Sequence, residues 1–213
     1  MERYFLYKSI LGTKIKLMKN ILILYYSQGG STKKMAHTIA LGVEASGASA
    51  TIKTVPNISA NTEKFEQSIP ENGDLYASKE DLTDCDGLIV GSPAYFGNMA
   101  SPLKHFLEKH ADIWFKGNLI GKPAGFFTAA SGMHAGHEST LLSMMIPFIH
   151  HGCIIVGVPY SEQALEHTRT GGTPYGASHL NTFSLNRTLS DDETKICKTL
   201  GKRVAEIARK FSS

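Results

Sequence analysis

Five short apolar segments, separated by helical patterns, constrain the fold of this chain more than any other feature. They are Ile21–Tyr26, Thr51–Val55, Gly87–Gly91, Ala124–Thr128 and Cys153–Val158. Four of them are almost continuously apolar, which is typical of strands that are buried on both faces of a parallel sheet. The exception, Thr51–Val55, alternates polar and apolar residues, which favours a strand at the edge of the sheet.

Helical patterns fill most of the intervals. Apolar residues recur at helical spacing in Met35–Val43, and Ser101 before Pro102 predicts an N-cap followed by the first turn of another helix. Two more helices are expected at His137–Ile149 and Asp191–Phe211, the second with acidic residues in its first turn and basic residues in its last.

Strands that alternate with helices predict right-handed crossovers and an α/β fold. We expect a flavodoxin-like, doubly wound sheet of five parallel strands in the order 2-1-3-4-5, with helices on both faces. Two long polar stretches, Pro56–Asp84 and Tyr160–Ser190, interrupt the pattern and are expected to be irregular.

The net charge of +3 lies entirely in the first 17 residues, which hold four basic side chains and one acidic one. The rest of the chain is neutral, which argues against a nucleic-acid partner. We expect residues 1–17 to be an N-terminal extension, absent from the native protein if translation begins at Met18. The alternative is an ordered N-terminal arm. Residues 18–213 are expected to form a single flavodoxin-like domain.

No apolar run approaches the roughly 20 residues that cross a bilayer, so no membrane insertion is expected. The three cysteines, Cys85, Cys153 and Cys197, show no CxxC spacing, which disfavours a disulfide framework and a zinc ribbon and favours the cytoplasm. His134 and His137 lack the carboxylate neighbours of a metal site, so we expect no metal.

Ligands of an open parallel sheet bind beyond the carboxyl ends of the strands, where the strand order reverses. Loops that leave the first, third and fourth strands should meet there. The first loop reads Ser27, Gln28, Gly29, Gly30, Ser31 and Thr32. Its glycines, hydroxyls and helix start suit a phosphate, although it matches neither GxxxxGK[ST] nor GxGxxG. The alternative is an ordinary Gly/Ser turn that caps a helix.

The other two loops carry different signals. Tyr95 and Phe96, in Ser92–Asn98, suit a flat apolar ring, unless both rings pack beneath the following helix. Small residues in Thr128–His134 let backbone amides approach a heteroaromatic edge, although a plain surface loop would have the same composition. A phosphate cradle beside a planar pocket on this fold predicts flavin mononucleotide (FMN).

Several longer motifs give this chain a specific resemblance to a known protein family. They are Leu24–Ser27, Gly91–Met99 with its FGNM segment, Ile113-Trp114, Gly136–Glu138, the His150-His151-Gly152 triplet and GGTPYGA at Gly171–Ala177. On these motifs, from about Met18 to Phe211, the chain resembles the WrbA family of FMN-dependent NAD(P)H:quinone oxidoreductases.

The resemblance implies a role for each candidate residue. Ser27, Gln28, Gly29, Gly30, Ser31 and Thr32 would hold the phosphate, and Ala94, Tyr95 and Phe96 would flank the isoalloxazine, with Pro93 and Gly97 beside them also binding the cofactor. Ala129, Ala130, Ser131, Gly132, Met133, His134 and Ala135 would line the polar edge of the ring. His150 would stand near the reactive face, and Trp114 would border the nicotinamide or quinone site. Two residues depart from the family, because Gly29 replaces a bulky aromatic residue and Tyr95 replaces a frequent arginine.

The resemblance also implies an activity. We expect two electrons to pass from NADH or NADPH through FMN to a quinone, with ping-pong kinetics, in a homotetramer or at least a dimer. The alternatives are a flavodoxin-type electron carrier and a regulatory module with a bound flavin. Carriers usually present a strongly acidic face, and the neutral body argues against that.

Overall fold

The computed structural model describes residues 18–58, 73–182 and 188–211. The expectation for residues 1–17, and that for the middle of the polar stretch Pro56–Asp84, therefore lie outside the described residues.

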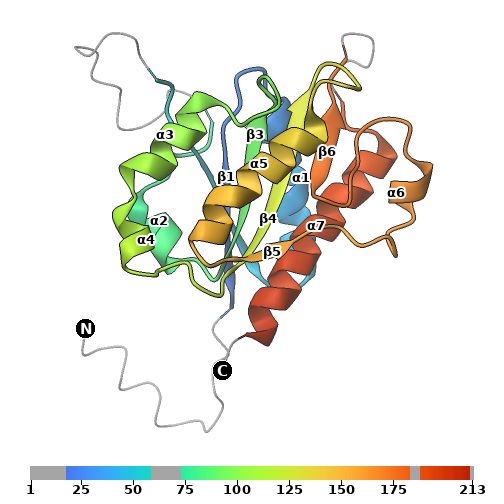
Figure 1. The fold of residues 1–213 in the computed structure, drawn as a ribbon. Helices are drawn as coiled ribbons and strands as arrows, with labels where there is room; N and C mark the ends of the chain where they lie inside the picture. Colours follow the sequence, from blue (N-terminus) through green and yellow to red (C-terminus); the bar gives the residue numbers. More distant parts are fainter. Residues whose placement is uncertain (1–17, 59–72, 183–187, 212–213) are drawn as a thin grey trace, which may run out of the picture.

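The central sheet has the predicted parallel order, β2-β1-β3-β4-β5 (Figure 1). Its strands are β1 (Asn20–Tyr25), β2 (Ser49–Thr54), β3 (Gly87–Pro93), β4 (Pro123–Ala130) and β5 (Ile154–Val156). Strands β3 and β4 are buried almost throughout, whereas β2 is half-buried and lies at the edge. The alternating pattern of β2 correctly predicted its position at the edge, and the continuous apolar patterns of β3 and β4 correctly predicted that they are buried.

A sixth strand, β6 (Ala177–Leu180), corrects the prediction for the far edge. Strand β5 pairs only with the first residues of β4, and β6 pairs with the last four, Phe127–Ala130. The segment predicted as one strand, Cys153–Val158, is shorter because Val158 bonds to Pro174 rather than to β4. The stretch Tyr160–Ser190 also contains α6 (Ala164–His167), so it is not wholly irregular.

Helices cover both faces of the sheet (Figure 1). Helices α1 (Ser31–Ala45) and α7 (Asp191–Lys210) pack on one face, and α3 (Ser101–Lys109) and α5 (His137–His150) pack on the other. The short helices α2 (Lys79–Asp84) and α4 (Asp112–Phe115) complete the second layer.

The start of α3 differs by one residue from the prediction. Its N-cap is Ala100, not Ser101, and no side chain caps the helix. Instead, the Ala100 N–H donates to Ser92 Oγ at 2.8 Å, so a hydroxyl from the end of β3 holds the helix start. Pro102 lies in the first turn as expected.

Two glycines allow α1 and α7 to pack closely. A Cβ atom added at Gly201 would lie 2.2 Å from the Ile39 carbonyl oxygen, and one added at Gly42 would lie 2.0 Å from that of Lys198. Both contacts are shorter than any real Cβ contact, so a larger residue would push the helices apart. The first of these helices, α1, begins at Ser31, within the first of the three loops.

Gly201→Ala is expected to lower the free energy of unfolding by about 1–3 kcal/mol, the usual cost of overpacking. Urea unfolding would measure it, with Lys202→Ala, an exposed neighbour in α7, as a control that should change little. An unchanged or higher urea midpoint for Gly201→Ala would contradict this close packing.

Candidate functional site

The loops that follow β1, β3 and β4 meet at the carboxyl ends of the strands, at the top of Figure 1. They surround a cavity of about 290 Å³, here called the loop cavity. Its lining residues are Ser27, Gln28, Gly29, Ser31, Thr32, Pro93, Ala94, Tyr95, Ala129, Ala130, Ser131 and Asn181. The structure therefore brings together residues from all three loops that the sequence singled out.

The first loop presents hydrogen-bond donors to this cavity. Gly30 is the N-cap of α1 with φ +85°, a left-handed conformation that glycine adopts without strain, and its N–H donates to Ser27 Oγ. Ser31 and Thr32 follow in the first helical turn and are both buried. Ser31 Oγ is shielded from solvent and has no hydrogen-bond partner among the described residues. A buried free hydroxyl at a helix N-terminus fits an anion such as a phosphate.

The second loop contains a tight turn with an exposed ring. The backbones of Tyr95 and Asn98 exchange hydrogen bonds of 2.9 and 3.0 Å, and Phe96 between them has φ +52°. Positive φ is uncommon and strained for an aromatic residue. The side chain of Phe96 is fully exposed, so it does not pack beneath α3. The alternative interpretation of Phe96 as a packing residue is therefore wrong.

A hydrogen bond joins the first and second loops. Tyr95 Oη donates to Gln28 Oε1 at 2.7 Å across the rim of the loop cavity. Beside it, burial and then the nearby Tyr95 hydroxyl raise the pKa of Tyr26, whose Oη donates to Asn57 Oδ1. Tyr26 is therefore a neutral donor at pH 7. The two neighbouring hollows, of about 300 and 440 Å³, also include Ser27 and Gln28, so they adjoin the loop cavity.

Asn181 belongs to the cavity although the sequence analysis did not select it. It follows β6, and its N–H donates to the Ala130 carbonyl at 2.7 Å, which places it beside the end of β4. Its Oδ1 is shielded from solvent and lacks a hydrogen-bond partner among the described residues. Strand β6 is short and carries serine and histidine, so no apolar run marked it. The nearest signal was its position just after the GGTPYGA motif.

A buried ion pair or hydrogen bond between His179 and Glu193 holds β6 in place. Glu193 Oε2 lies 3.0 Å from His179 Nδ1, and both side chains are inaccessible to solvent. Glu193 also accepts backbone N–H bonds from Gly171, Leu180 and Ser190, at 2.8 to 2.9 Å. Three separate segments around the end of β6 therefore depend on one carboxylate.

These contacts set the ionisation of Glu193. Burial raises the pKa of Glu193, but hydrogen bonds from His179 and from the backbone N–H groups of Leu180 and Ser190 outweigh it, and the net pKa lies below the usual value. Glu193 is therefore ionised at neutral pH. The acidic first turn of α7 was expected, but its contact with His179 was not visible in the sequence.

The remaining loop residues lie close to the loop cavity without lining it. Gly30 lines the adjoining hollow of about 300 Å³. The others, which belong to the outer parts of the second and third loops, are Phe96, Gly97, Gly132, Met133, His134 and Ala135. Met133 and Phe96 are exposed, so they are available to a ligand that extends out of the cavity.

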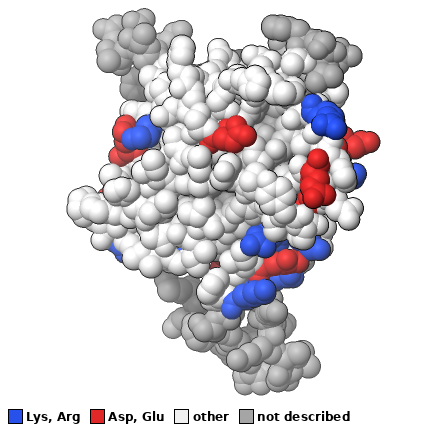
Figure 2. Space-filling view, turned by 45° about the vertical axis from the view of Figure 1, so that its right-hand side comes forward, with Lys and Arg blue, Asp and Glu red and all other residues white. Residues whose placement is uncertain are grey.

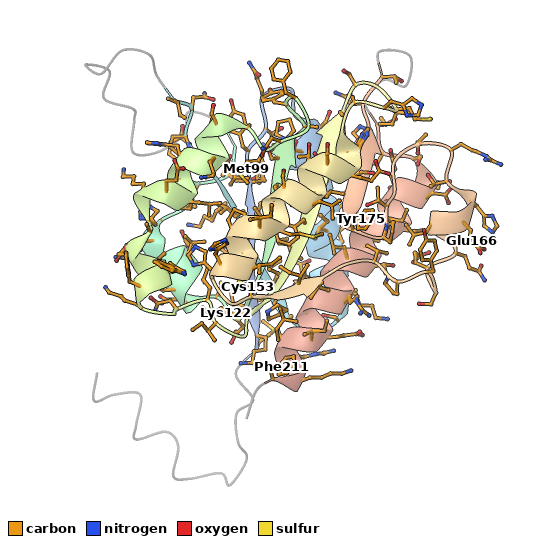
Figure 3. All side chains as sticks on the ribbon, in the orientation of Figure 1. Met99, Lys122, Cys153, Glu166, Tyr175 and Phe211 are labelled. Carbon is orange, nitrogen blue, oxygen red and sulfur yellow. The ribbon has the colours of Figure 1, made fainter. Side chains whose placement is uncertain are left out.

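His150 and Trp114 are not at the loop cavity of their own chain. Helix α5 starts beside the third loop and runs 14 residues, roughly 20 Å, away from it before His150. There Trp114 Nε1 donates to the His150 carbonyl at 2.8 Å, and Gly121 binds Gly152 near the start of β4. Figure 3 labels Lys122 and Cys153 at this lower end. Within one chain, therefore, His150 and Trp114 do not join the three loops at the loop cavity.

Within the described residues, we find no cluster of three or more His, Cys, Asp and Glu side chains arranged for a metal ion. The helices in these same ranges include none with the length and apolar character needed to span a bilayer.

The residues of the loop cavity fit FMN. The free hydroxyl of Ser31 and the start of α1 match its phosphate, and the exposed rings of the second loop match a planar ring system. Tyr95 and Phe96 would flank that ring, and Ala129, Ala130 and Ser131 would face its polar edge.

Comparisons with known proteins agree with this chemistry. Residues 20–165 match the family described as NADPH-dependent FMN reductase. A protein of Gluconacetobacter diazotrophicus named NAD(P)H dehydrogenase (quinone) is 40% identical, over 92% of this chain and 100% of its own length. A protein of Rhizobium rhizogenes with the same name is 36% identical, over 91% and 99%.

Solved structures show the same fold. The WrbA-like flavodoxin protein of Agrobacterium tumefaciens superposes with a TM-score of 0.63 at 22% identity, covering 90% of this chain and 98% of that one. The two-electron reduced flavodoxin of Megasphaera elsdenii gives a TM-score of 0.54 at 19% identity, covering 87% and 98%. These likenesses confirm the flavodoxin-like fold class.

Proposed function

The chain belongs to the NADPH-dependent FMN reductase family, and from this premise we propose that it is an FMN-dependent oxidoreductase that passes two electrons from NAD(P)H to a quinone. The observation that carries the proposal is the free, buried Ser31 hydroxyl at the meeting point of the three loops. Relatives named NAD(P)H dehydrogenase (quinone) support the choice of donor and acceptor.

The protein's part in this reaction is to bind and orient. Ser31, Thr32 and the first N–H groups of α1 would hold the phosphate, and the second and third loops would fix the plane of the ring. When bound, FMN supplies the group that accepts and returns a hydride. The neutral Tyr26 leaves its part of the rim without a fixed charge.

Donor and acceptor would use the same open face in turn, so we propose ping-pong kinetics. Steady-state rates with NADH or NADPH and benzoquinone test the function directly. Parallel lines in double-reciprocal plots are expected. A protein that binds FMN but does not turn over NAD(P)H with benzoquinone would instead be an electron carrier or a regulatory module.

We also propose that the protein works as a homotetramer. Helix α5 exposes Leu142, Ile146 and Ile149 on one side, and Phe115 is 80% exposed nearby on α4. A broad area of the surface in Figure 2 carries no charged side chain. Exposed apolar side chains that gather on one side of a helix are typical of subunit interfaces.

Ile146→Glu is expected to shift the assembly towards the 23.2 kDa monomer, because a charge would be buried in the proposed interface. Light scattering measures the mass, and the wild type should have about four times that value. Leu41→Glu, at an exposed apolar position on α1, is the matched control and should leave the mass unchanged. An unaltered mass for Ile146→Glu would contradict the interface.

His150 and Trp114 lie too far from the loop cavity of their own chain to serve it. In such an assembly they would instead serve the flavin site of a neighbouring subunit. His150→Ala should then leave FMN affinity unchanged and lower quinone reduction at saturating FMN. His167→Ala on α6 is an exposed histidine control.

Unpaired thiols at Cys85, Cys153 and Cys197 suit a reducing compartment, and we propose the cytoplasm.

A further inference from the structure

The side-chain oxygen of Asn181 has no hydrogen-bond partner among the described residues although it is shielded from solvent. Leaving such an atom unpaired in the folded protein is unfavourable. Asn181 lines the loop cavity beside Ala129, Ala130 and Ser131. The unpaired oxygen therefore lies where a ligand would meet it.

The backbone around Asn181 holds this oxygen in a defined place. The Asn181 N–H is bound to the Ala130 carbonyl, which continues the pairing of β6 with β4. The preceding residue, Leu180, donates its N–H to the buried Glu193 carboxylate. Such fixed surroundings lower the entropy lost when a ligand binds.

The chemistry of the oxygen limits what it can bind. An amide oxygen only accepts hydrogen bonds, whereas the other unpaired atom of the cavity, Ser31 Oγ, can also donate. A phosphate offers acceptors, which suit Ser31 and not Asn181 Oδ1. The donors of FMN are the hydroxyl groups of its ribityl chain and one ring N–H.

The position of Asn181 favours the ribityl chain. The loop cavity includes Ser31 and Thr32, at the phosphate end, and also Tyr95, Ala129, Ala130 and Ser131, at the ring end. Asn181 therefore shares the space that connects the phosphate to the ring. Resting on the proposed function, we propose that Asn181 Oδ1 accepts a hydrogen bond from a ribityl hydroxyl group of FMN.

The experiment compares FMN with riboflavin, which has the ribityl chain but lacks the phosphate. Dissociation constants are measured by flavin fluorescence for apoprotein carrying Asn181→Leu or Asn181→Ala. Both variants should weaken FMN and riboflavin by the same factor, about 2- to 13-fold, as expected for one neutral hydrogen bond. Two variants of different volume separate the loss of the bond from a steric effect.

Asn118→Leu is the matched control. Asn118 Oδ1 is also shielded and unpartnered, but it lies after α4, away from the loop cavity. This variant should leave both dissociation constants unchanged. The absorption spectrum of the bound flavin should be the same in all variants, because a ribityl contact does not touch the ring.

Other outcomes overturn the inference in distinguishable ways. Unchanged affinity in both Asn181 variants would mean that the oxygen makes no such bond. An effect on FMN alone would assign Asn181 to the phosphate, and a shifted spectrum would assign it to the ring. Failure of the wild-type protein to bind FMN would overturn the proposed function itself, and the inference with it.

Discussion

Ser31→Ala is expected to raise the dissociation constant for FMN about 10- to 150-fold. The substitution removes a hydroxyl that would donate to a charged phosphate, and such bonds contribute roughly 1.5–3 kcal/mol. In the apoprotein the same hydroxyl is buried without a partner among the described residues. Its removal should therefore leave the stability of the apoprotein unchanged or slightly higher. Flavin titration and urea unfolding measure the two quantities separately.

These two measurements distinguish a phosphate contact from a structural role. A phosphate contact weakens FMN binding without lowering the stability of the apoprotein, whereas a structural role lowers that stability. Thr38→Ala is the control, because its hydroxyl donates to Lys34 on the exposed side of the same helix. It should not affect FMN binding. If Ser31→Ala binds FMN as tightly as the wild type, the phosphate does not lie at the start of α1. A fall in apoprotein stability would show that Ser31 has a structural partner.

Glu193→Ala is expected to lower the free energy of unfolding by about 3–5 kcal/mol, as for the loss of one partner from a buried pair. The change leaves His179 and the N–H groups of Gly171 and Leu180 without their acceptor. That is a large share of the roughly 5–15 kcal/mol that stabilises a typical domain. Glu166→Ala, on α6, is the exposed control and should change little (Figure 3).

The effect of Glu193→Ala should also depend on pH. The pKa of Glu193 is lowered in the folded protein, so its contribution is fully present above the unfolded-state value of about 4.3. The contribution is lost as the pH falls below that value. Urea unfolding of wild type and variant should therefore give a smaller difference at about pH 3 than at about pH 5.5. A difference that grows in acid would contradict an ionised Glu193.

Most of the fold was predictable because its signals are local. The continuous apolar runs of β1, β3 and β4 indicate burial on both faces, and the spacing in α1, α5 and α7 indicates amphipathic helices. Strand β6 escaped prediction because it has four residues, two of them polar, and is buried by elements that are distant in the sequence, among them β4 and α7. The start of α3 shifted because Ser92, nine positions before Ser101, holds it.

The candidate site was predictable in part for a related reason. Glycines and hydroxyls after β1 and aromatic residues after β3 have the chemistry of a flavin site within each loop. That the loops share one cavity follows from parallel topology, because their strands end at the same edge. Asn181 was not predictable, since its role depends on which strand pairs with the end of β4.

The sequence by itself determined the parallel α/β fold, its strand order and the chemistry of the three loops, because these depend on residue type and short-range spacing. Only the tertiary structure decided which distant groups meet. It paired His179 with Glu193 and placed the free oxygen of Asn181 at the loop cavity. Such pairings join residues that local patterns treat separately, because they arise from the packing of whole elements.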